Sequence, residues 1–201
     1  MDTFKTISSP SEGIFKDKGS KFLAFAIPIS SAEEVKEIVK AYRREYYDAR
    51  HVCYAYMLGL GRNDFRANDD GEPSGTAGRP ILGQINSNEL TNILVIVVRY
   101  FGGVLLGTGG LVIAYKEATS DALSNAEIIV KTVDDVISLR FDYVLLNEVM
   151  RILKDSNVQI KSQLFDNECN IQLSIRRSDS EILKSKLLKI IGVQLDNSLS
   201  E

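Results

Sequence analysis

Residues 69–80 read DDGEPSGTAGRP, and the interpretation of the surrounding chain starts from this stretch. It holds three carboxylates, two hydroxyls, three glycines, two prolines and one arginine, with almost no apolar side chain to bury. Such a composition follows neither a helical nor a strand period. We therefore predict a polar loop over roughly 61–80 that is ordered by hydrogen bonds and charge. Binding residues concentrate in loops of this kind on a rigid scaffold, and a solvated surface loop is the alternative interpretation.

A second stretch, residues 93–110, joins an apolar run to a glycine-rich turn. Residues 93–98 are continuously apolar, which is typical of a strand buried on both faces. The chain continues as RYFGGVLLGTGG, and a helical pattern begins at Leu111. A strand, a glycine turn and a helix start together present backbone N–H groups to an anion, although tight chain reversal alone also explains such glycines. The turn is neither a Walker loop nor a dinucleotide-binding turn, because the lysine and the βαβ context are missing.

The candidate binding residues in these two stretches are polar side chains and glycines suited to an anion. They are Ser74, Thr76, Arg79, Arg99, Gly102, Gly103, Gly107, Thr108, Gly109 and Gly110. We expect the glycines to supply positive φ or close backbone approach, and Thr108 to cap the helix. A buried guanidinium needs carboxylate, carbonyl or phosphate partners. We therefore predict that the two loops meet at one surface, where Arg79 or Arg99 bonds to the loop-ordering acids Asp69, Asp70 and Glu72.

Together the two stretches resemble the motifs of the YigZ/IMPACT family, in its bacterial two-domain form. The segments KGSKF at 18–22 and ARHVCYAY at 49–56 stand where that family has its other two motifs. The resemblance therefore adds four candidates, Lys18, Lys21, Arg50 and His51. Members often carry Arg at the position of Ile113 and a second His at the position of Val52, so this chain lacks one basic group beside the glycine turn.

The resemblance implies an α+β protein of two domains. Residues 1–134 would form an IMPACT-type domain with the ribosomal-protein-like βαβ fold of domain IV of elongation factor G, and residues 135–201 a ferredoxin-like domain. Eukaryotic relatives act in translation regulation by competing for an activator of the amino-acid-starvation kinase. The implied partners are RNA, the ribosome, a translation factor or a regulatory protein.

The apolar pattern also predicts the order of the elements. In the first domain it indicates strands over 20–29, 51–60 and 92–101, a helix after a capping box at Ser30 and Glu33, a short helix over 81–89 and a long helix to about 125. The second domain reads as β-α-β-β-α with a hairpin at Asp166-Asn167, a capping box at Ser178 and Glu181, and a short last strand from Val193.

Composition narrows the functional classes. The chain has 201 residues, 44% of them hydrophobic, and a net charge of −3. No apolar run is long enough to cross a bilayer, and the first residues lack a secretory pattern, so we expect a cytoplasmic protein without a membrane partner. The acidic balance argues against an overall electrostatic attraction to nucleic acid. Local clusters of basic residues either form a binding patch or are simply solvated surface. Cys53 and Cys169 predict neither a disulfide framework nor a metal cluster.

Two catalytic interpretations compete with structural ones. His51 and Cys53 leave the same face of a strand, so they form either a nucleophilic dyad or, as we favour, a hydrogen-bonding histidine at the rim of a site. The acids of 69–72 either hold Mg²⁺ with a substrate phosphate or pair with basic side chains, and we favour pairing. We predict no catalytic residue, no metal and no cofactor. The leading hypothesis is a non-enzymatic module that binds RNA or the translation machinery; the alternative is a Mg²⁺-dependent enzyme on a phosphate-bearing, nucleotide-like substrate.

Overall fold

The structure is a computed structural model, and it describes residues 2–166 and 168–196 of a mixed α/β chain with several sheets. The chain divides into two compact units, Phe4–Lys131 on the one hand and Thr132–Glu201 with Met1–Thr3 on the other. The domain boundary predicted near residue 134 lies a few residues beyond that division. Within the described residues no helix combines the length and apolarity that a membrane crossing requires.

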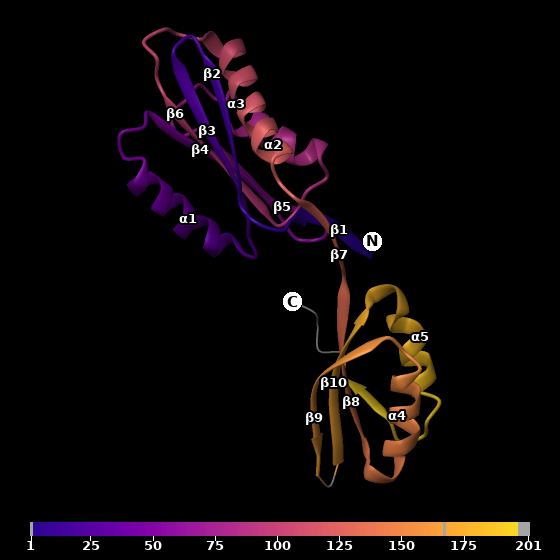
Figure 1. Ribbon diagram of the computed structural model, residues 1–201. Helices are drawn as coiled ribbons and strands as arrows, with labels where there is room; N and C mark the ends of the chain where they lie inside the picture. The colour runs from indigo at the N-terminus through magenta and orange to yellow at the C-terminus, as the bar shows by residue number, and fades with distance from the viewer. Residues whose placement is uncertain (1, 167, 197–201) are drawn as a thin grey trace. The chain divides into compact units, whose positions relative to one another are not determined.

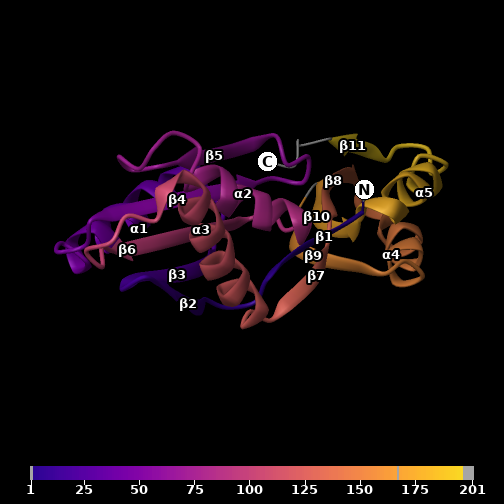
Figure 2. The ribbon, with the colours of Figure 1, turned by 90° about the horizontal axis from the view of Figure 1, so that it is seen from above.

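The N-terminal unit contains a five-stranded antiparallel sheet. In spatial order its strands are β2 (Ser11–Asp17), β3 (Ser20–Pro28), β6 (Ile93–Tyr100), β4 (His51–Leu58) and β5 (Asp64–Asn68). Strands β2 and β5 form the two edges (Figure 2). Strands β3, β4 and β6 are the three that the apolar pattern predicts. The central β6 is apolar from Ile93 to Val98, as expected of a strand that helices cover on both faces of the sheet.

Helices lie on both faces of this sheet (Figure 1). Helix α1 (Ala32–Glu45) covers one face, where it packs on alternate residues of β3, β4 and β6. Helices α2 (Gly78–Ser87) and α3 (Gly107–Ser124) cover the other face. Because side chains alternate along a strand, His51 and Arg99 belong to the α2–α3 face, whereas Tyr54 belongs to the α1 face.

Two further strands, β1 (Thr3–Ile7) and β7 (Ile128–Thr132), pair as a separate ribbon. The sequence pattern does not predict β1, β2 or β5. Strand β5 lies inside the segment that we predicted to be a loop, and its side chains are mostly exposed. An edge strand of this kind has no buried face, so it leaves no apolar alternation in the sequence.

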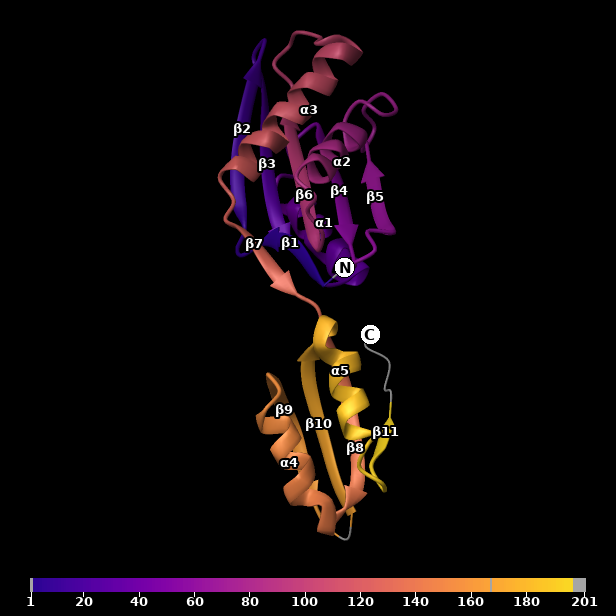
Figure 3. The same cartoon turned by 90° about the vertical axis from the view of Figure 1, so that its right-hand side faces the viewer.

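The C-terminal unit contains a four-stranded sheet with two helices on one face (Figure 3). In chain order its elements are β8 (Asp134–Asp142), the 3₁₀ turn η1 (Tyr143–Leu145), α4 (Leu146–Lys154), β9 (Val158–Phe165), β10 (Glu168–Arg176), α5 (Arg177–Leu187) and β11 (Gln194–Asp196). The strand order is β11-β8-β10-β9. Strands β9 and β10 pair antiparallel as predicted, but Asn167 of the predicted hairpin turn lies outside the described residues.

Four predicted helix starts are wrong. The cap of α1 is Ser31, whose Oγ accepts from the Glu34 amide at 3.2 Å, so the predicted capping box is displaced by one residue. Helix α2 begins at Gly78 rather than 81, and α5 begins at Arg177 without a side-chain cap at Ser178.

Helix α3 begins at Gly107, ahead of the apolar period that starts at Leu111. Thr108 therefore lies inside the first turn and is not the cap, which is Leu106 without a side-chain hydrogen bond. Glycine is a poor helix former, so propensity alone places this start too late.

Candidate functional site

Asp69 fixes the polar loop to the start of α2. Its carboxylate accepts hydrogen bonds from the backbone amides of Gly75 at 2.8 Å, Ala77 at 3.0 Å and Gly78 at 2.8 Å. Burial alone would raise the pKa of Asp69, but these three donors outweigh it and hold the pKa below its usual value. The ionised Asp69 thus acts as a remote cap for α2.

Asp70 ties the same loop to β4 and to α1. Its Oδ2 accepts from the Val52 amide at 2.7 Å, and its Oδ1 accepts from the guanidinium of Arg43. The Asp70 carbonyl oxygen lies 2.7 Å from His51 Nδ1. Because a carbonyl only accepts, Nδ1 carries the proton of the neutral imidazole. Asp70 has a positive φ of 43°, which an Asx residue tolerates better than most.

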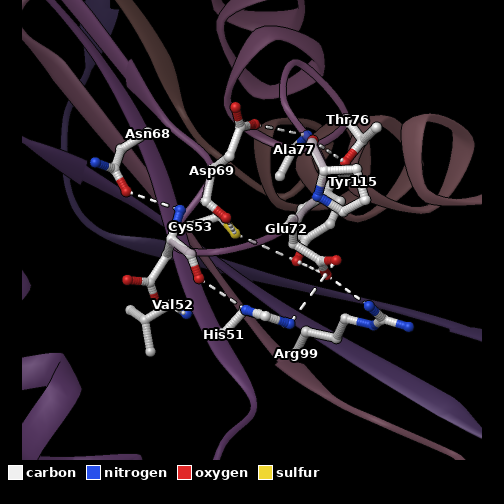
Figure 4. A network of polar contacts seen from close by, with 12 residues as sticks. His51, Val52, Cys53, Asn68, Asp69, Glu72, Thr76, Ala77, Arg99 and Tyr115 are labelled. Carbon is white, nitrogen blue, oxygen red and sulfur yellow. Dashed lines mark hydrogen bonds and ion pairs between the residues drawn. The ribbon is translucent and has the colours of Figure 1, made fainter. Parts of the chain in front are cut away.

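Glu72, Arg99 and Tyr115 form a buried polar cluster (Figure 4). Glu72 Oε1 accepts from Arg99 Nη1 at 2.6 Å and from the Tyr115 hydroxyl at 2.8 Å. The Arg99 guanidinium lies over the rings of Phe22 and Phe101, with its Cζ 5.5 and 5.7 Å from the two centroids. The predicted pairing of Arg99 with an acid of the loop is therefore confirmed, and the two loops meet at one surface.

His51 and Cys53 share a face but do not form a dyad. The Cys53 thiol donates toward the Asp69 carbonyl at 3.0 Å and lies 3.3 Å from the Tyr115 hydroxyl. Burial raises the pKa of the Cys53 thiol, which outweighs the opposite effect of the Tyr115 hydrogen bond. A fully buried thiol without an imidazole partner is a poor nucleophile, so this geometry favours a structural Cys53.

A cavity of about 420 Å³ opens where the two loops meet. Its walls are mainly apolar, with a polar corner at the Glu72 cluster. The lining residues are Arg50, His51, Glu72, Pro73, Arg99, Phe101, Leu105, Leu106, Gly107, Thr108 and Leu111. The first turn of α3 borders the cavity through Gly107 and Thr108. The cavity therefore gathers residues from both loops, the start of β4 and the start of α3. We call it the loop cavity.

A second concavity of about 470 Å³ lies on the α1 face of the same sheet. It is lined by Lys36, Val39, Lys40, Arg43, Arg44, Tyr54 and Asn68. The four cations stand at i, i+4, i+7 and i+8 on α1, so they form one stripe. Among these cations, only Arg43 forms an ion pair within the described residues, with Asp70. Glu33 and Glu37 stand three positions before Lys36 and Lys40 on the same side of α1. We call this concavity the basic groove.

Comparisons with known proteins agree with the motif pattern. Residues 18–123 match the family described as the Impact N-terminal domain. The chain belongs to the IMPACT family. A Haemophilus influenzae IMPACT family member is 34% identical over 172 residues, which is 85% of this chain and 84% of the relative. IMPACT family member YigZ of Escherichia coli is 35% identical over 76% of each chain. A crystal structure described as a hypothetical protein matches the whole of both chains at 29% identity and a TM-score of 0.74.

The remaining candidates of the IMPACT motifs lie outside the loop cavity. Lys18 and Gly19 form the turn between β2 and β3, and this turn packs so directly on Gly102 that a Cβ there would overlap the Gly19 carbonyl carbon. Lys21 stands on β3 opposite Tyr100. Thr76 is buried and donates to the Pro73 carbonyl at 2.7 Å. Five further candidates are also absent from the cavity lining: Ser74, Arg79, Gly103, Gly109 and Gly110.

Several residues of the loop cavity and of the polar cluster beside it were not identified from the sequence. Tyr115 donates to Glu72, and Phe101, Leu105 and Leu111 supply the apolar walls. On sequence alone an aromatic or leucine at helical spacing reads as core. The available signal was three large apolar residues, Phe101, Val104 and Leu105, in a glycine-rich segment that follows no helical or strand period. In the structure all three are exposed.

The three acids of the polar loop already accept hydrogen bonds from other groups of the protein. Asp69 accepts three backbone amides, Asp70 accepts an amide and a guanidinium, and Glu72 holds Arg99 and Tyr115. No group of three or more His, Cys, Asp or Glu among residues 2–166 and 168–196 is arranged to hold a metal ion. This arrangement makes the carboxylates ordering elements of the loop.

Proposed function

We propose that this protein is a non-enzymatic, cytoplasmic module that binds RNA of the translation machinery through the loop cavity. The observation that carries the proposal is the cavity itself, because it combines apolar walls, cationic side chains and a helix start in one place. Family membership supports the link to translation, since the resemblance implies translation regulation for eukaryotic members.

The start of α3 suits a phosphate. Helix α3 has 18 residues, and its cap Leu106 makes no side-chain hydrogen bond. The first amides therefore keep their capacity to donate, and the helix dipole favours an anion there. Arg50 is exposed at the same cavity and adds positive charge.

The cavity walls suit one unstacked base. A volume of about 420 Å³ is in the range of small-ligand sites. Phe101 is 46% exposed, so part of this aromatic side chain is accessible to a planar partner. Single-stranded RNA is commonly recognised by splaying out bases and stacking them on aromatic side chains.

The basic groove suits the backbone on either side of that base. Three of its cations, Lys36, Lys40 and Arg44, are left for a ligand. The loop 69–72 separates the groove from the cavity, since Asp70 contacts Arg43 on one side and His51 on the other. Lys18, Lys21 and Arg79 are further candidates for phosphate contacts.

The finer fold assignments belong to the same proposal. We assign the N-terminal unit to the fold of domain IV of elongation factor G, and the C-terminal unit to the ferredoxin-like fold. The element order β8-α4-β9-β10-α5-β11 with strand order β11-β8-β10-β9 supports the second assignment. Likeness to ribosome-associated domains is an analogy of fold and does not by itself give a function.

The test measures binding of labelled single-stranded RNA by anisotropy, and ribosome co-sedimentation, at two salt concentrations. Phe101→Ala is compared with Phe65→Ala, an exposed aromatic on edge strand β5. Loss of one stacked base costs about 1–3 kcal/mol, so we expect roughly 5- to 150-fold weaker binding for Phe101→Ala and no change for Phe65→Ala.

Charge variants and turnover complete the test. Lys18→Glu and Arg79→Glu should weaken binding and flatten its salt dependence. Salt-insensitive binding that is identical in all these proteins would reject the RNA proposal. Turnover of a nucleotide that needs Mg²⁺ and vanishes in Asp70→Asn would instead support the enzyme alternative.

A further inference from the structure

Two hydrogen-bond acceptors face each other at the polar corner of the loop cavity. His51 Nε2 and Glu72 Oε2 lie 3.8 Å apart, and both residues line the cavity. The Glu72 side chain is 3% exposed and that of His51 is 15% exposed, so this corner is largely shielded from bulk water.

In the neutral ring of His51, Nε2 is an acceptor. Nδ1 lies 2.7 Å from the Asp70 carbonyl oxygen, which only accepts, so Nδ1 holds the proton of the neutral ring. Nε2 then presents a lone pair toward Glu72. A lone pair facing a carboxylate oxygen at this distance is unfavourable unless a donor lies between them.

The second acceptor is left open by the way Glu72 is held. Both of its buried donors, Arg99 Nη1 and the Tyr115 hydroxyl, bind Oε1. Among the described residues no hydrogen-bond donor reaches Oε2. Because Glu72 lines the cavity, Oε2 is an acceptor open to the donor group of a ligand there.

A donor is also left without a partner at the same wall. Arg99 Nε is buried and makes no hydrogen bond within the described residues. The cavity corner therefore offers two acceptors, and the paired Arg99 beside them keeps one buried N–H without a partner within the described residues. The two acceptors fit a ligand that presents an amino group, as the edges of adenine and cytosine do.

We propose that the loop cavity selects a nucleobase with an exocyclic amino group, which donates one N–H to His51 Nε2 and the other to Glu72 Oε2. The inference rests on the proposed RNA binding and specifies its ligand. An amino nitrogen about 2.9 Å from each acceptor fits between two atoms that are 3.8 Å apart. Uracil carries a carbonyl at the corresponding position, and this oxygen would face two acceptors.

The decisive comparison changes one amino group and leaves the protein intact. Labelled RNA is displaced by the pentamers UUAUU and UUPUU, in which P is purine riboside, the adenosine analogue without the amino group. The measurements are made at pH 8, where imidazole in water is neutral. We expect UUAUU to bind roughly 5- to 150-fold more tightly than UUPUU, and UUCUU to show the same advantage over UUUUU.

Two protein variants test the location. His51→Ala removes one acceptor and should shrink the advantage of UUAUU over UUPUU without changing the salt slope. The adjacent Arg50→Ala should weaken all pentamers alike, because its charge faces phosphate. Glu72 is left unchanged, since its loss would strand Arg99.

The outcomes separate this inference from the proposed function. Equal binding of UUAUU and UUPUU by a protein that binds RNA would overturn amino-group recognition and leave RNA binding standing. A discrimination unchanged in His51→Ala would move the recognition to another site and also overturn the inference. Absence of any RNA binding by the wild type would reject the proposed function and this inference together.

Discussion

The loop cavity and the basic groove lie on opposite faces of one sheet, and their charged side chains differ in pairing and in exposure. In the cavity, Arg99 and Glu72 neutralise each other at 2.6 Å with side chains 6% and 3% exposed. In the groove, three of four cations have no acid partner within the described residues, and Arg43 pairs with Asp70 while about half exposed. The cavity charges therefore stabilise the fold and shape a pocket, whereas three of the four groove cations make no ion pair within the described residues.

The largest expected effect is a difference in stability between variants of Arg99 in the cavity and of Arg43 in the groove. Arg99→Met leaves the Glu72 carboxylate buried without its cation, so we expect the free energy of unfolding to fall by about 3–5 kcal/mol. Arg43→Met removes a half-exposed pair, and the expected loss is below about 1 kcal/mol. Urea denaturation of both variants measures the difference. Equal losses would mean that the cavity pair and the groove pair play the same role.

The next effect concerns Asp69, which orders the loop between the two sites. Asp69→Ala leaves three backbone amides without their acceptor, and we expect a loss of about 2–4 kcal/mol. The folded-state pKa of Asp69 is below its ordinary value, so its contribution is complete at neutral pH. That contribution is lost as the pH falls from about 4 through the lower, folded-state pKa.

Urea denaturation of wild type and Asp69→Ala between pH 7 and 3 checks this sign. The gap between the two proteins should close as the acid form of Asp69 takes over. Glu37→Ala, an exposed acid of α1, is the control and should follow the wild type at every pH. A gap that widens toward pH 3 contradicts the role given to Asp69.

A smaller effect tests the groove by salt dependence. The triple variant Lys36→Gln, Lys40→Gln, Arg44→Gln should make the log–log slope of RNA affinity against salt shallower by about 2. It should keep the preference for amino-bearing bases, because that preference belongs to the cavity. The charge-matched control is Lys116→Gln, Lys131→Gln, Lys189→Gln, which removes three exposed cations elsewhere. Equal slopes for both triples would show that the groove binds no phosphate.

The last prediction is that neither cysteine thiol reacts in the folded protein. Burial raises the pKa of the Cys53 thiol and of the Cys169 thiol, so neither should react with a disulfide reagent at pH 8 in the folded protein. Both should react in concentrated urea. Rapid modification of Cys53 in the native state, with loss of RNA binding, would show that Cys53 is reactive and contradict its structural role.

Much of the N-terminal sheet was predictable because its core strands leave a strong apolar signal. Strands β3, β4 and β6 are buried against helices, and the helix α1 shows a clear period. Strands β2 and β5 were not predicted because neither has a fully buried side chain, so neither shows a buried apolar alternation in the sequence. The start of α3 was misplaced because Gly107, Gly109 and Gly110 are poor helix formers that tertiary packing nevertheless accommodates.

The candidate site was predictable where chemistry demanded a partner. A guanidinium at the end of a buried strand needs an acid, and this requirement correctly linked Arg99 to the loop of 69–72. The direction of side chains was not predictable from spacing. Cys53 and His51 share a face, but Cys53 turns to the Asp69 carbonyl and His51 to the Asp70 carbonyl.

The contact between Gly102 and Gly19 has a practical consequence for protein engineering. No side chain fits at Gly102, so labels and insertions at the turn of β2 and β3 or at the adjoining loop would force the backbones apart. Gly83, in the middle of α2, is exposed, and a Cβ at this position would have no neighbouring atom within 4 Å. Gly83→Cys therefore offers an attachment point for a fluorescent reporter, and the better helix propensity of cysteine should stabilise α2 by roughly 0.3–0.5 kcal/mol.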